Sequence, residues 1–257
     1  MYEGFAEIYD RLMYDVDYSS WADYLESIFH AYGCKPSLVL DLGCGTGKLC
    51  MEMAGRDYEM IGVDISVDML SRAREEAEKR KLDILFLNQD MTDFELYGTV
   101  DAVFCMMDSI NYVTRKKDLL RMFKLVKNYL NPQGIFIFDI NTPYKLKNIL
   151  GNNVFYEIDN DVAYIWQNSY NNRSRLCRFE LTFFVRDENE DTYRRFDEVH
   201  YEKAYGIDEL EDLIRQAGLE PVAVYDNLSF NAPNEKSERV FFVCINKDAK
   251  KPSLTGE

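Results

Sequence analysis

Apolar and polar positions follow two different periodicities along the chain, and the change comes after Pro143. Up to that residue, short apolar runs alternate with stretches whose apolar positions recur at helical spacing. The apolar runs predict strands, and the other stretches predict helices. Predicted strands lie at 38–41, 60–64, 84–88, 101–105 and 134–140, and predicted helices at 19–32, 46–55, 66–79 and 115–130. This alternation predicts a parallel sheet with right-handed crossovers.

After Pro143, apolar and polar side chains alternate at period two, and turn-rich breaks separate the segments. The segments with this pattern are 154–158, 161–170, 175–186 and 192–204. They predict an antiparallel sheet with one covered face. A predicted helix at 207–217 and strands at 221–226 and 239–245 then return the chain to the first sheet.

The two patterns predict a division of the chain. Residues 1–150 and 205–246 form the expected core, residues 151–204 an antiparallel insert, and residues 247–257 a flexible polar tail. The insert leaves the core after its fifth strand, at the edge of the sheet where ligands of open α/β sheets bind. We therefore expect the insert to cover that site and exclude water from it.

The composition limits the classes of partner and the cellular compartment. The net charge is −15, which argues against a nucleic-acid substrate because phosphates require a basic face. The basic run Arg115-Lys116-Lys117 fits a solvated helix start. The six cysteines form no Cys-x-x-Cys pair, which favours reduced thiols in a cytoplasmic protein. We expect no membrane segment, no secretion signal and no metal site.

The first predicted strand runs into a glycine-rich loop. Residues 41–47 read Asp-Leu-Gly-Cys-Gly-Thr-Gly, a spacing that lets a ligand lie against backbone without Cβ atoms. A dinucleotide-binding fingerprint needs Gly or Ala where Lys48 stands. A phosphate-binding P-loop needs Ser or Thr where Leu49 stands. The loop therefore belongs to neither class.

Acidic residues follow four predicted strands at the same edge of the sheet. They are Asp41, Asp64, Asp90 and Asp108. An acid after the second strand commonly accepts hydrogen bonds from ribose hydroxyls. Four acids around one crevice would repel a pyrophosphate but suit a cofactor with net positive charge. Asp108 has an equal alternative, which is to cap the next helix.

Four motifs of this chain occur in the same order as the motifs of one family, and their spacing is similar. The loop at 41–47, Asp64, Gln89-Asp90-Met91 and Leu130-Asn131-Pro132-Gln133-Gly134 resemble the motifs of class I S-adenosylmethionine (SAM)-dependent methyltransferases. The likeness covers residues 36–145 best, and Gln133 stands where that family usually has glycine. The resemblance implies SAM as the cofactor. It also implies an α/β fold, with a doubly wound, Rossmann-like sheet of seven mostly parallel strands and the small antiparallel insert over the active site.

The family implies contacts with the methionine end of SAM. Gly43 and Gly45 would approach it, and Asp41 would face its ammonium group. Met106, which follows the fourth strand, would lie beside the transferable methyl group. These roles are carried over from the resemblance at matching positions.

The family also implies contacts with the ribose and adenine. Asp64 would accept hydrogen bonds from both ribose hydroxyls, and Ile65 and Met69 would lie against the adenine. Asp90 would accept from the adenine amino group, while the Met91 backbone would meet the ring. Two structural alternatives stay open: Asp64 caps the following helix, and Asp90 closes a turn.

Aromatic side chains gather near the N-terminus. Tyr9, Tyr18 and Trp21 have side chains suited to covering a sulfonium through cation–π contact or to hydrogen-bonding the methionine carboxylate. The equal alternative is a helix that packs on the sheet edge.

Three regions are candidates for contact with the methyl acceptor. One is the loop 106–112 with Asn111 and Tyr112, and another is Asn141 and Tyr144 after the fifth strand. In amino-methylating nucleic-acid enzymes, a motif similar to Asn141–Tyr144 follows the fourth strand, so we interpret this segment as a turn.

The third candidate region is the predicted strand at 192–204. His200 shares a face there with Phe196, Glu198 and Glu202. Its unperturbed pKa suits a general base, which is needed only if the acceptor arrives protonated. A structural histidine is the alternative. We expect Asn111, Tyr112 and His200 to act as catalytic residues.

The expected function is transfer of a methyl group from SAM to nitrogen or oxygen of a small molecule. The chain resembles glycine N-methyltransferase-like and sugar-amine N,N-dimethyltransferase-like enzymes, including a Tyr9-Asp10 pair near the N-terminus. Fold-level analogy fixes neither the acceptor nor the oligomeric state. Alternatives are an RNA or protein methyltransferase and a SAM-binding regulatory module without turnover.

Overall fold

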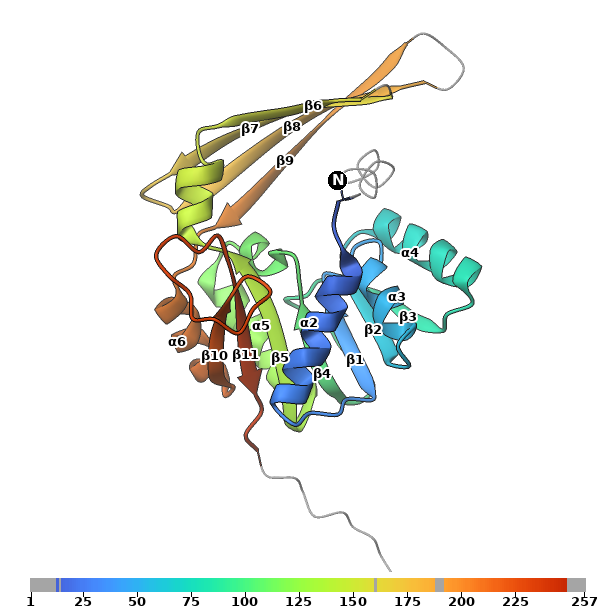
Figure 1. The fold of residues 1–257 in the computed structure, drawn as a ribbon, viewed down its shortest axis with the longest axis vertical. Helices are drawn as coiled ribbons and strands as arrows, with labels where there is room; N and C mark the ends of the chain where they lie inside the picture. The colour runs from blue at the N-terminus through green and yellow to red at the C-terminus, as the bar shows by residue number, and fades with distance from the viewer. Residues whose placement is uncertain (1–12, 14, 160, 188–191, 249–257) are drawn as a thin grey trace, which may run out of the picture.

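The computed structural model describes residues 13, 15–159, 161–187 and 192–248. Tyr9 and most of the predicted tail lie outside the described residues. The described chain forms two sheets, and the smaller one stands over one edge of the larger (Figure 1). Within the described chain, no helix is both long enough and apolar enough to cross a membrane.

The larger sheet has seven strands in the order β10-β11-β5-β4-β1-β2-β3. The strands are β1 (Leu38–Leu42), β2 (Glu59–Asp64), β3 (Ile84–Asn88), β4 (Val100–Cys105), β5 (Leu130–Asn141), β10 (Glu220–Asp226) and β11 (Arg239–Ile245). Strand β11 runs antiparallel to both of its neighbours, and the other pairings are parallel. The order reverses between β1 and β4, which is the position where open α/β sheets bind ligands. This architecture confirms the expected fold class.

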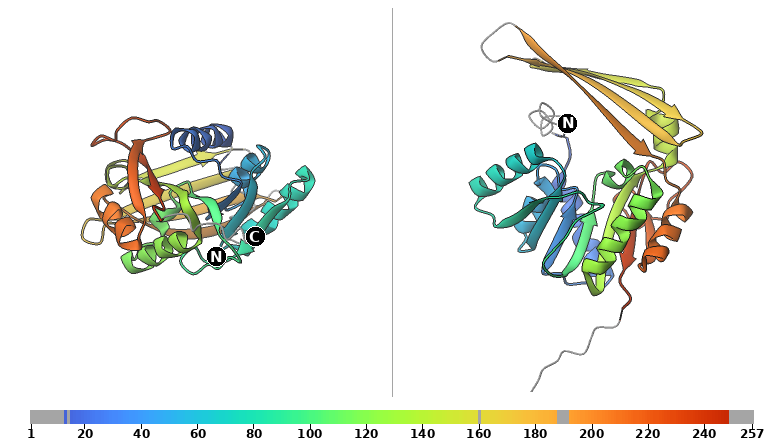
Figure 2. Two further views of the ribbon diagram at one scale, coloured as in Figure 1. Left: turned by 90° about the horizontal axis from the view of Figure 1, so that it is seen from below. Right: turned by 180° about the vertical axis from the view of Figure 1, so that it is seen from behind.

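Helices cover both faces of the larger sheet. They are α2 (Tyr18–Ala31), α3 (Lys48–Ala54), α4 (Val67–Arg80), α5 (Lys116–Tyr129) and α6 (Ile207–Ala217). Val39 points into the apolar cluster with α2, α3 and α4, whereas Leu40 points into the cluster with α5 and α6. Figure 2 shows α5 and α6 on the face opposite α2. Strands buried on both faces explain the continuous apolar runs in the sequence.

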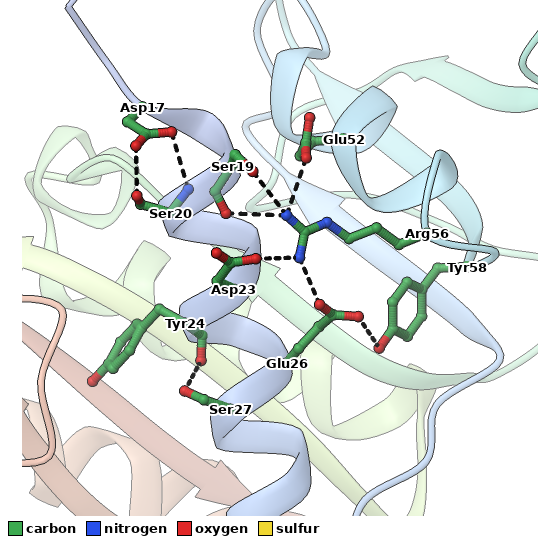
Figure 3. A network of polar contacts seen from close by, with 10 residues as sticks. All are labelled: Asp17, Ser19, Ser20, Asp23, Tyr24, Glu26, Ser27, Glu52, Arg56 and Tyr58. Atoms are coloured by element: carbon green, nitrogen blue, oxygen red, sulfur yellow. Dashed lines mark hydrogen bonds and ion pairs between the residues drawn. The ribbon is translucent and has the colours of Figure 1, made fainter.

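An arginine network fixes α2 against α3. The Arg56 guanidinium lies 2.6 Å from Asp23 Oδ1, 2.6 Å from Glu26 Oε2 and 3.1 Å from Glu52 Oε1, as Figure 3 shows. Tyr58 donates its hydroxyl hydrogen to the other oxygen of Glu26 at 3.2 Å. Single exposed ion pairs stabilise little, but this network joins three carboxylates through one cation. It holds the start of α2 beside the helix that follows the glycine loop.

The smaller sheet is antiparallel, in the order β6-β7-β8-β9. Its strands are β6 (Val154–Ile158), β7 (Val162–Asn171), β8 (Leu176–Arg186) and β9 (Tyr193–Lys203), all within the predicted insert. We call the side that carries Trp166, Phe179 and Phe183 the inner face of the insert. The opposite side carries exposed residues such as Ile165. One covered face was expected from the period-two pattern.

The insert joins the core through short segments that the sequence did not predict. The π-helical segment η2 (Lys145–Leu150) follows β5, and its Leu146 and Leu150 pack against Cys177 and Phe179. A 3₁₀ segment, η1 (Ser109–Tyr112), follows β4. Both lie at the carboxyl edge of the larger sheet, so the inner face of the insert is fixed above that edge.

Candidate active site

One cavity of about 960 Å³ lies between the carboxyl edge of the larger sheet and the inner face of the insert. Its floor comes from the loops after β1, β2 and β4. Its roof includes Tyr164, Trp166, Phe179, Leu181 and Phe183. This volume is at the upper end for small-molecule sites, and the lining combines many apolar side chains with a few polar ones, as such sites do.

The glycine loop runs close under the cavity because its residues lack side chains where space is short. Gly43 has φ +78°, and a Cβ there would lie 3.0 Å from Ser109 Oγ and 3.1 Å from Met91 Cε. Gly45 has φ +54°, with open space on its Cβ side. Both conformations favour glycine, and both residues line the cavity. The Gly43 N–H donates to the Val63 carbonyl at 2.8 Å, which ties the loop to β2.

Asp41 is a buried carboxyl group at the end of β1, with 3% of its surface exposed. Burial raises its pKa to about 7, the Cys50 thiol hydrogen bond opposes this rise, and the charge of Asp64 adds to it. Cys50 Sγ lies 3.2 Å from Asp41 Oδ2. A buried carboxyl group that lines a cavity is suited to a cationic ligand.

Asp64 ends β2 and also lines the cavity. Its Oδ2 accepts from the Gly45 N–H at 2.8 Å, and its Oδ1 accepts from the Ser66 N–H at 2.8 Å. The cap of α4 is Ser66, whose hydroxyl accepts from the Met69 N–H, so Asp64 is not the helix cap. Burial raises the pKa of Asp64. A carboxylate has about four acceptor positions, so Asp64 retains capacity for a ligand hydroxyl.

The other two acids of the expected crevice have different roles. Asp90 is exposed, does not line the cavity, and its Oδ1 accepts from the Thr92 N–H at 2.7 Å. This is the turn-closing alternative. Asp108 lines the cavity but forms an ion pair with Arg239 at 2.7 Å. Arg239 also binds the fully buried Asp139, so two carboxyl groups share one positive charge at this end of the cavity. Of the four acids expected around the crevice, three line the cavity, and one of these three is paired with Arg239.

The remaining side chains expected at the cofactor do line the cavity. They are Ile65, Met69, Met91 and Met106, together with Tyr18 and Trp21 of α2. Ile65 is 61% exposed and sits at the rim, whereas Met69 and Met106 are buried.

Trp21 takes the packing role considered for the N-terminal aromatics. It packs on the sheet, with its ring centroid 5.6 Å from that of Phe241. The Arg239 guanidinium carbon lies 5.5 Å from the Trp21 ring centroid, so this cation–π contact is made within the protein. Trp21 nevertheless contributes to the cavity wall.

Asn111 does not contact the cavity, contrary to the expectation of a catalytic role. It is fully buried, and its Nδ2 donates to the Asn141 and Lys203 carbonyls at 3.0 Å each. Its Oδ1 accepts from the Asn141 N–H at 3.0 Å. Because its amide groups are bonded to backbone, Asn111 fastens β9 of the insert to β5. We do not carry its catalytic role forward.

Tyr112 and His200 do line the cavity. Their ring centroids lie 6.0 Å apart at an interplanar angle of 76°, an edge-to-face arrangement. Burial lowers the pKa of His200, so this imidazole is mostly neutral at pH 7. It is correspondingly a weaker base than an exposed histidine.

Sequence reasoning missed Glu202 and Lys145 as cavity residues. Glu202 is 2% exposed, and its Oε2 accepts from Asn141 Nδ2 at 3.0 Å. Lys145 begins η2 and lines the same cavity. The one signal for Glu202 was its place on the strand face of His200. Nothing in the sequence pattern pointed to Lys145, since η2 was not predicted.

The chain is similar to known methyltransferases. Residues 39–134 match the family described as "Methyltransferase domain". YqeM of Bacillus subtilis (strain 168), which its name places among the methyltransferases, is 34% identical over 243 residues, covering 94% of this chain and 96% of that protein. A crystal structure of an S-adenosylmethionine-dependent methyltransferase from Clostridium acetobutylicum ATCC 824 has a TM-score of 0.86 and 35% identity, and covers 95% of this chain and 98% of that chain.

A third relative matches about half of the chain. The dTDP-3-amino-3,6-dideoxy-alpha-D-glucopyranose N,N-dimethyltransferase of Streptomyces fradiae is 29% identical over 136 residues, 52% of each protein. The two matches over nearly the full length include the insert as well as the core. They confirm the family that the four motifs indicated. The chain therefore belongs to the S-adenosylmethionine-dependent methyltransferases.

Proposed function

We propose that this protein transfers a methyl group from SAM to a nitrogen or oxygen atom of a small molecule. The observation that carries the proposal is the single cavity that joins the glycine loop to the aromatic inner face of the insert. Residues 1–150 and 205–246 bind the cofactor, and the insert at 151–204 selects the acceptor. The partial similarity to a sugar-amine dimethyltransferase supports a small acceptor.

The cavity floor fits SAM. Asp41 is a buried carboxyl suited to the ammonium group, Asp64 has free acceptor sites suited to the ribose hydroxyls, and a Cβ at Gly43 would crowd the loop. Ile65, Met69, Met91 and Met106 supply apolar walls for the adenine and the methionine chain. When bound, the cofactor supplies a methyl group on a positively charged sulfur. The contribution of the protein is to align the acceptor with this methyl group and to exclude water.

The roof favours a compact, partly apolar acceptor. Trp166 and Phe179 meet edge to face with centroids 5.5 Å apart, and Phe183 stacks on Phe196 at 5.0 Å. Among the described residues, the buried Trp166 Nε1 has no hydrogen-bond partner. A polar group on the acceptor is a suitable partner for it.

The six cysteines are free thiols, which supports the cytoplasm as the proposed location.

Incubation with labelled SAM and a fractionated metabolite extract tests this function. We expect label in a small-molecule fraction together with formation of S-adenosylhomocysteine. Label only in RNA or protein would favour the macromolecular alternatives. Tight SAM binding without turnover in any fraction would favour a regulatory module.

Asp41 makes cofactor binding depend on pH. Its pKa is raised to about 7, so below that pH the carboxyl is protonated in the free protein. The cofactor ammonium favours the ionised form, and binding must then release this proton. Affinity should therefore fall as the pH drops below about 7, approaching tenfold per unit. Above about pH 8 the ammonium itself loses its proton, which weakens the contact again.

Calorimetry in two buffers of different ionisation enthalpy measures this proton release. We expect release at about pH 6 and much less at about pH 8. Asp64 also has a raised pKa and acts in the same direction, so Asp41→Asn is the control that removes only the contribution of Asp41. Binding at about pH 6 without proton release would rule out the ammonium contact.

A further inference from the structure

Glu202 is a buried carboxyl on the cavity wall that the cofactor site does not use. It lies on β9, at the position paired with Cys177, and is 2% exposed. Asn141 Nδ2 donates to its Oε2 at 3.0 Å, and both residues line the cavity. A buried carboxylate needs a compensating charge and enough hydrogen-bond donors, because desolvation otherwise disfavours it.

The same corner has an unsatisfied acceptor on Asn141. Among the described residues, Asn141 Oδ1 is buried and has no hydrogen-bond partner. Asn141 and Glu202 are joined by their hydrogen bond, so their acceptor oxygens belong to one polar corner. An acceptor without a partner at a cavity wall indicates that a bound molecule brings the donor.

The charges around Glu202 come from several elements. Burial raises its pKa well above the usual value, and Asp108 after β4 adds to the rise. The Asn141 hydrogen bond, Lys145 of η2 and Arg239 of β11 oppose it. Arg239 is already paired with two carboxylates, and burial lowers the pKa of Lys145 itself. The protein therefore supplies only part of the positive charge that an ionised Glu202 requires.

We propose that Glu202, with Asn141 beside it, receives the methyl acceptor as a protonated amine and takes up its proton during transfer. This inference rests on the proposed function and narrows it to nitrogen. An ammonium group has several N–H donors and a full charge, so it satisfies Glu202 and Asn141 Oδ1 together. A hydroxyl acceptor offers one donor and no charge.

The proton and electron balance of the step is simple. The ammonium N–H bond breaks, the proton goes to a carboxylate oxygen of Glu202, and the nitrogen regains its lone pair. That pair forms the new bond to the methyl carbon, while the carbon–sulfur bond breaks and leaves its electrons on sulfur. Burial raises the pKa of Glu202, which makes it a better proton acceptor here than an ordinary glutamate. His200, with its lowered pKa, is the weaker candidate.

Binding of a matched pair of probes tests the assignment without turnover. Benzylamine is charged at neutral pH and benzyl alcohol is not, while both fit an aromatic wall. In the complex with S-adenosylhomocysteine, we expect benzylamine to bind more tightly than benzyl alcohol. Glu202→Gln should lower the affinity for benzylamine by about 10-fold to 10²-fold and leave the affinity for benzyl alcohol unchanged. Glu198→Gln is the matched control, because Glu198 lies on the same strand face but does not line the cavity.

Unchanged affinity of Glu202→Gln for S-adenosylhomocysteine shows that the variant is folded. Equal binding of the two probes, absence of benzylamine binding at millimolar concentration, or equal loss in Glu198→Gln would each overturn the proposal. If Glu202 had only a structural role, Glu202→Gln would lower the affinity for both probes alike.

Kinetics with the acceptor found in the metabolite extract gives a second readout. Glu202→Gln should lower kcat/KM by about 10²-fold at neutral pH. The deficit should shrink as the pH rises through the pKa of the amine, because free amine needs no base. O-methylation of the acceptor, or a constant deficit at all pH values, would overturn the role of Glu202. Failure to label any small molecule would instead overturn the proposed function, and the probe-binding result remains a separate outcome.

Discussion

Asp64→Ala is expected to lower the affinity for SAM by roughly 10²-fold to 10⁴-fold. In the proposed complex the carboxylate accepts two ribose hydrogen bonds, each contributing about 1.5–3 kcal/mol. At about 1.4 kcal/mol for each factor of ten, their loss gives this range. The carboxylate also accepts from the Gly45 N–H at 2.8 Å, so the substitution loosens the glycine loop. Calorimetric titration of the folded variant with SAM and with S-adenosylhomocysteine measures the effect.

Two variants separate the ribose contact from general damage. Asp64→Asn keeps the shape of the side chain but turns one acceptor into a donor, and should lose nearly as much affinity. Asp83→Ala makes the same change at an exposed aspartate just before β3, at the opposite edge of the sheet, and should bind normally. Near-native affinity of a folded Asp64→Ala protein would sink the assignment of Asp64 to the ribose.

The core fold was accessible from the sequence because its strands are buried on both faces. Val39 and Leu40 enter different apolar clusters, which makes the run at 38–41 apolar throughout. In the insert, only one face is covered, and the sequence alternates accordingly. The predicted helix at 115–130 included Leu130. In the structure Leu130 pairs with Val100, so it belongs to β5 instead of α5.

The cofactor side of the site was more predictable than the acceptor side. Asp41, Gly43 and Asp64 lie at or just after the carboxyl ends of strands, so the topology alone brings them to one edge. The pairing of Asp108 with Arg239 joins residues 131 positions apart and depends on β11 lying beside β5. No local pattern encodes such a contact.

Asn111 and Glu202 show why the acceptor side of the site could not be predicted from the sequence. An asparagine in a loop after β4 looks the same in sequence whether it faces a ligand or fastens two strands. Glu202 has an ordinary residue type whose chemistry changes only because the folded insert buries it. Burial of a single side chain depends on the tertiary structure. The pKa that decides the use of this side chain therefore depends on the tertiary structure as well.

Replacing most of the insert should separate cofactor binding from methyl transfer. We would replace residues 153–201 with a short Gly-Ser linker and keep Glu202–Ala204, because Asn111 bonds the Lys203 carbonyl. The cofactor loops stay intact, so SAM affinity should fall by about tenfold or less, an amount close to one modest contact. Methyl transfer should fall by at least about 10³-fold, because the acceptor loses alignment and water enters. Calorimetry and product mass spectrometry measure the two effects.

A finer variant keeps the sheet and removes only its aromatic wall. Trp166→Ala with Phe183→Ala should leave SAM binding unchanged and raise KM for the acceptor, since both rings line the cavity. Ile165→Ala is the matched control, because Ile165 precedes Trp166 and lies on the opposite, exposed face.

The protein in which the linker replaces residues 153–201 tests the role of the whole insert. Should this shortened protein still methylate its acceptor at full rate, the insert would have another purpose. Should it lose SAM binding as well, the division into a cofactor core and an acceptor cover would be wrong.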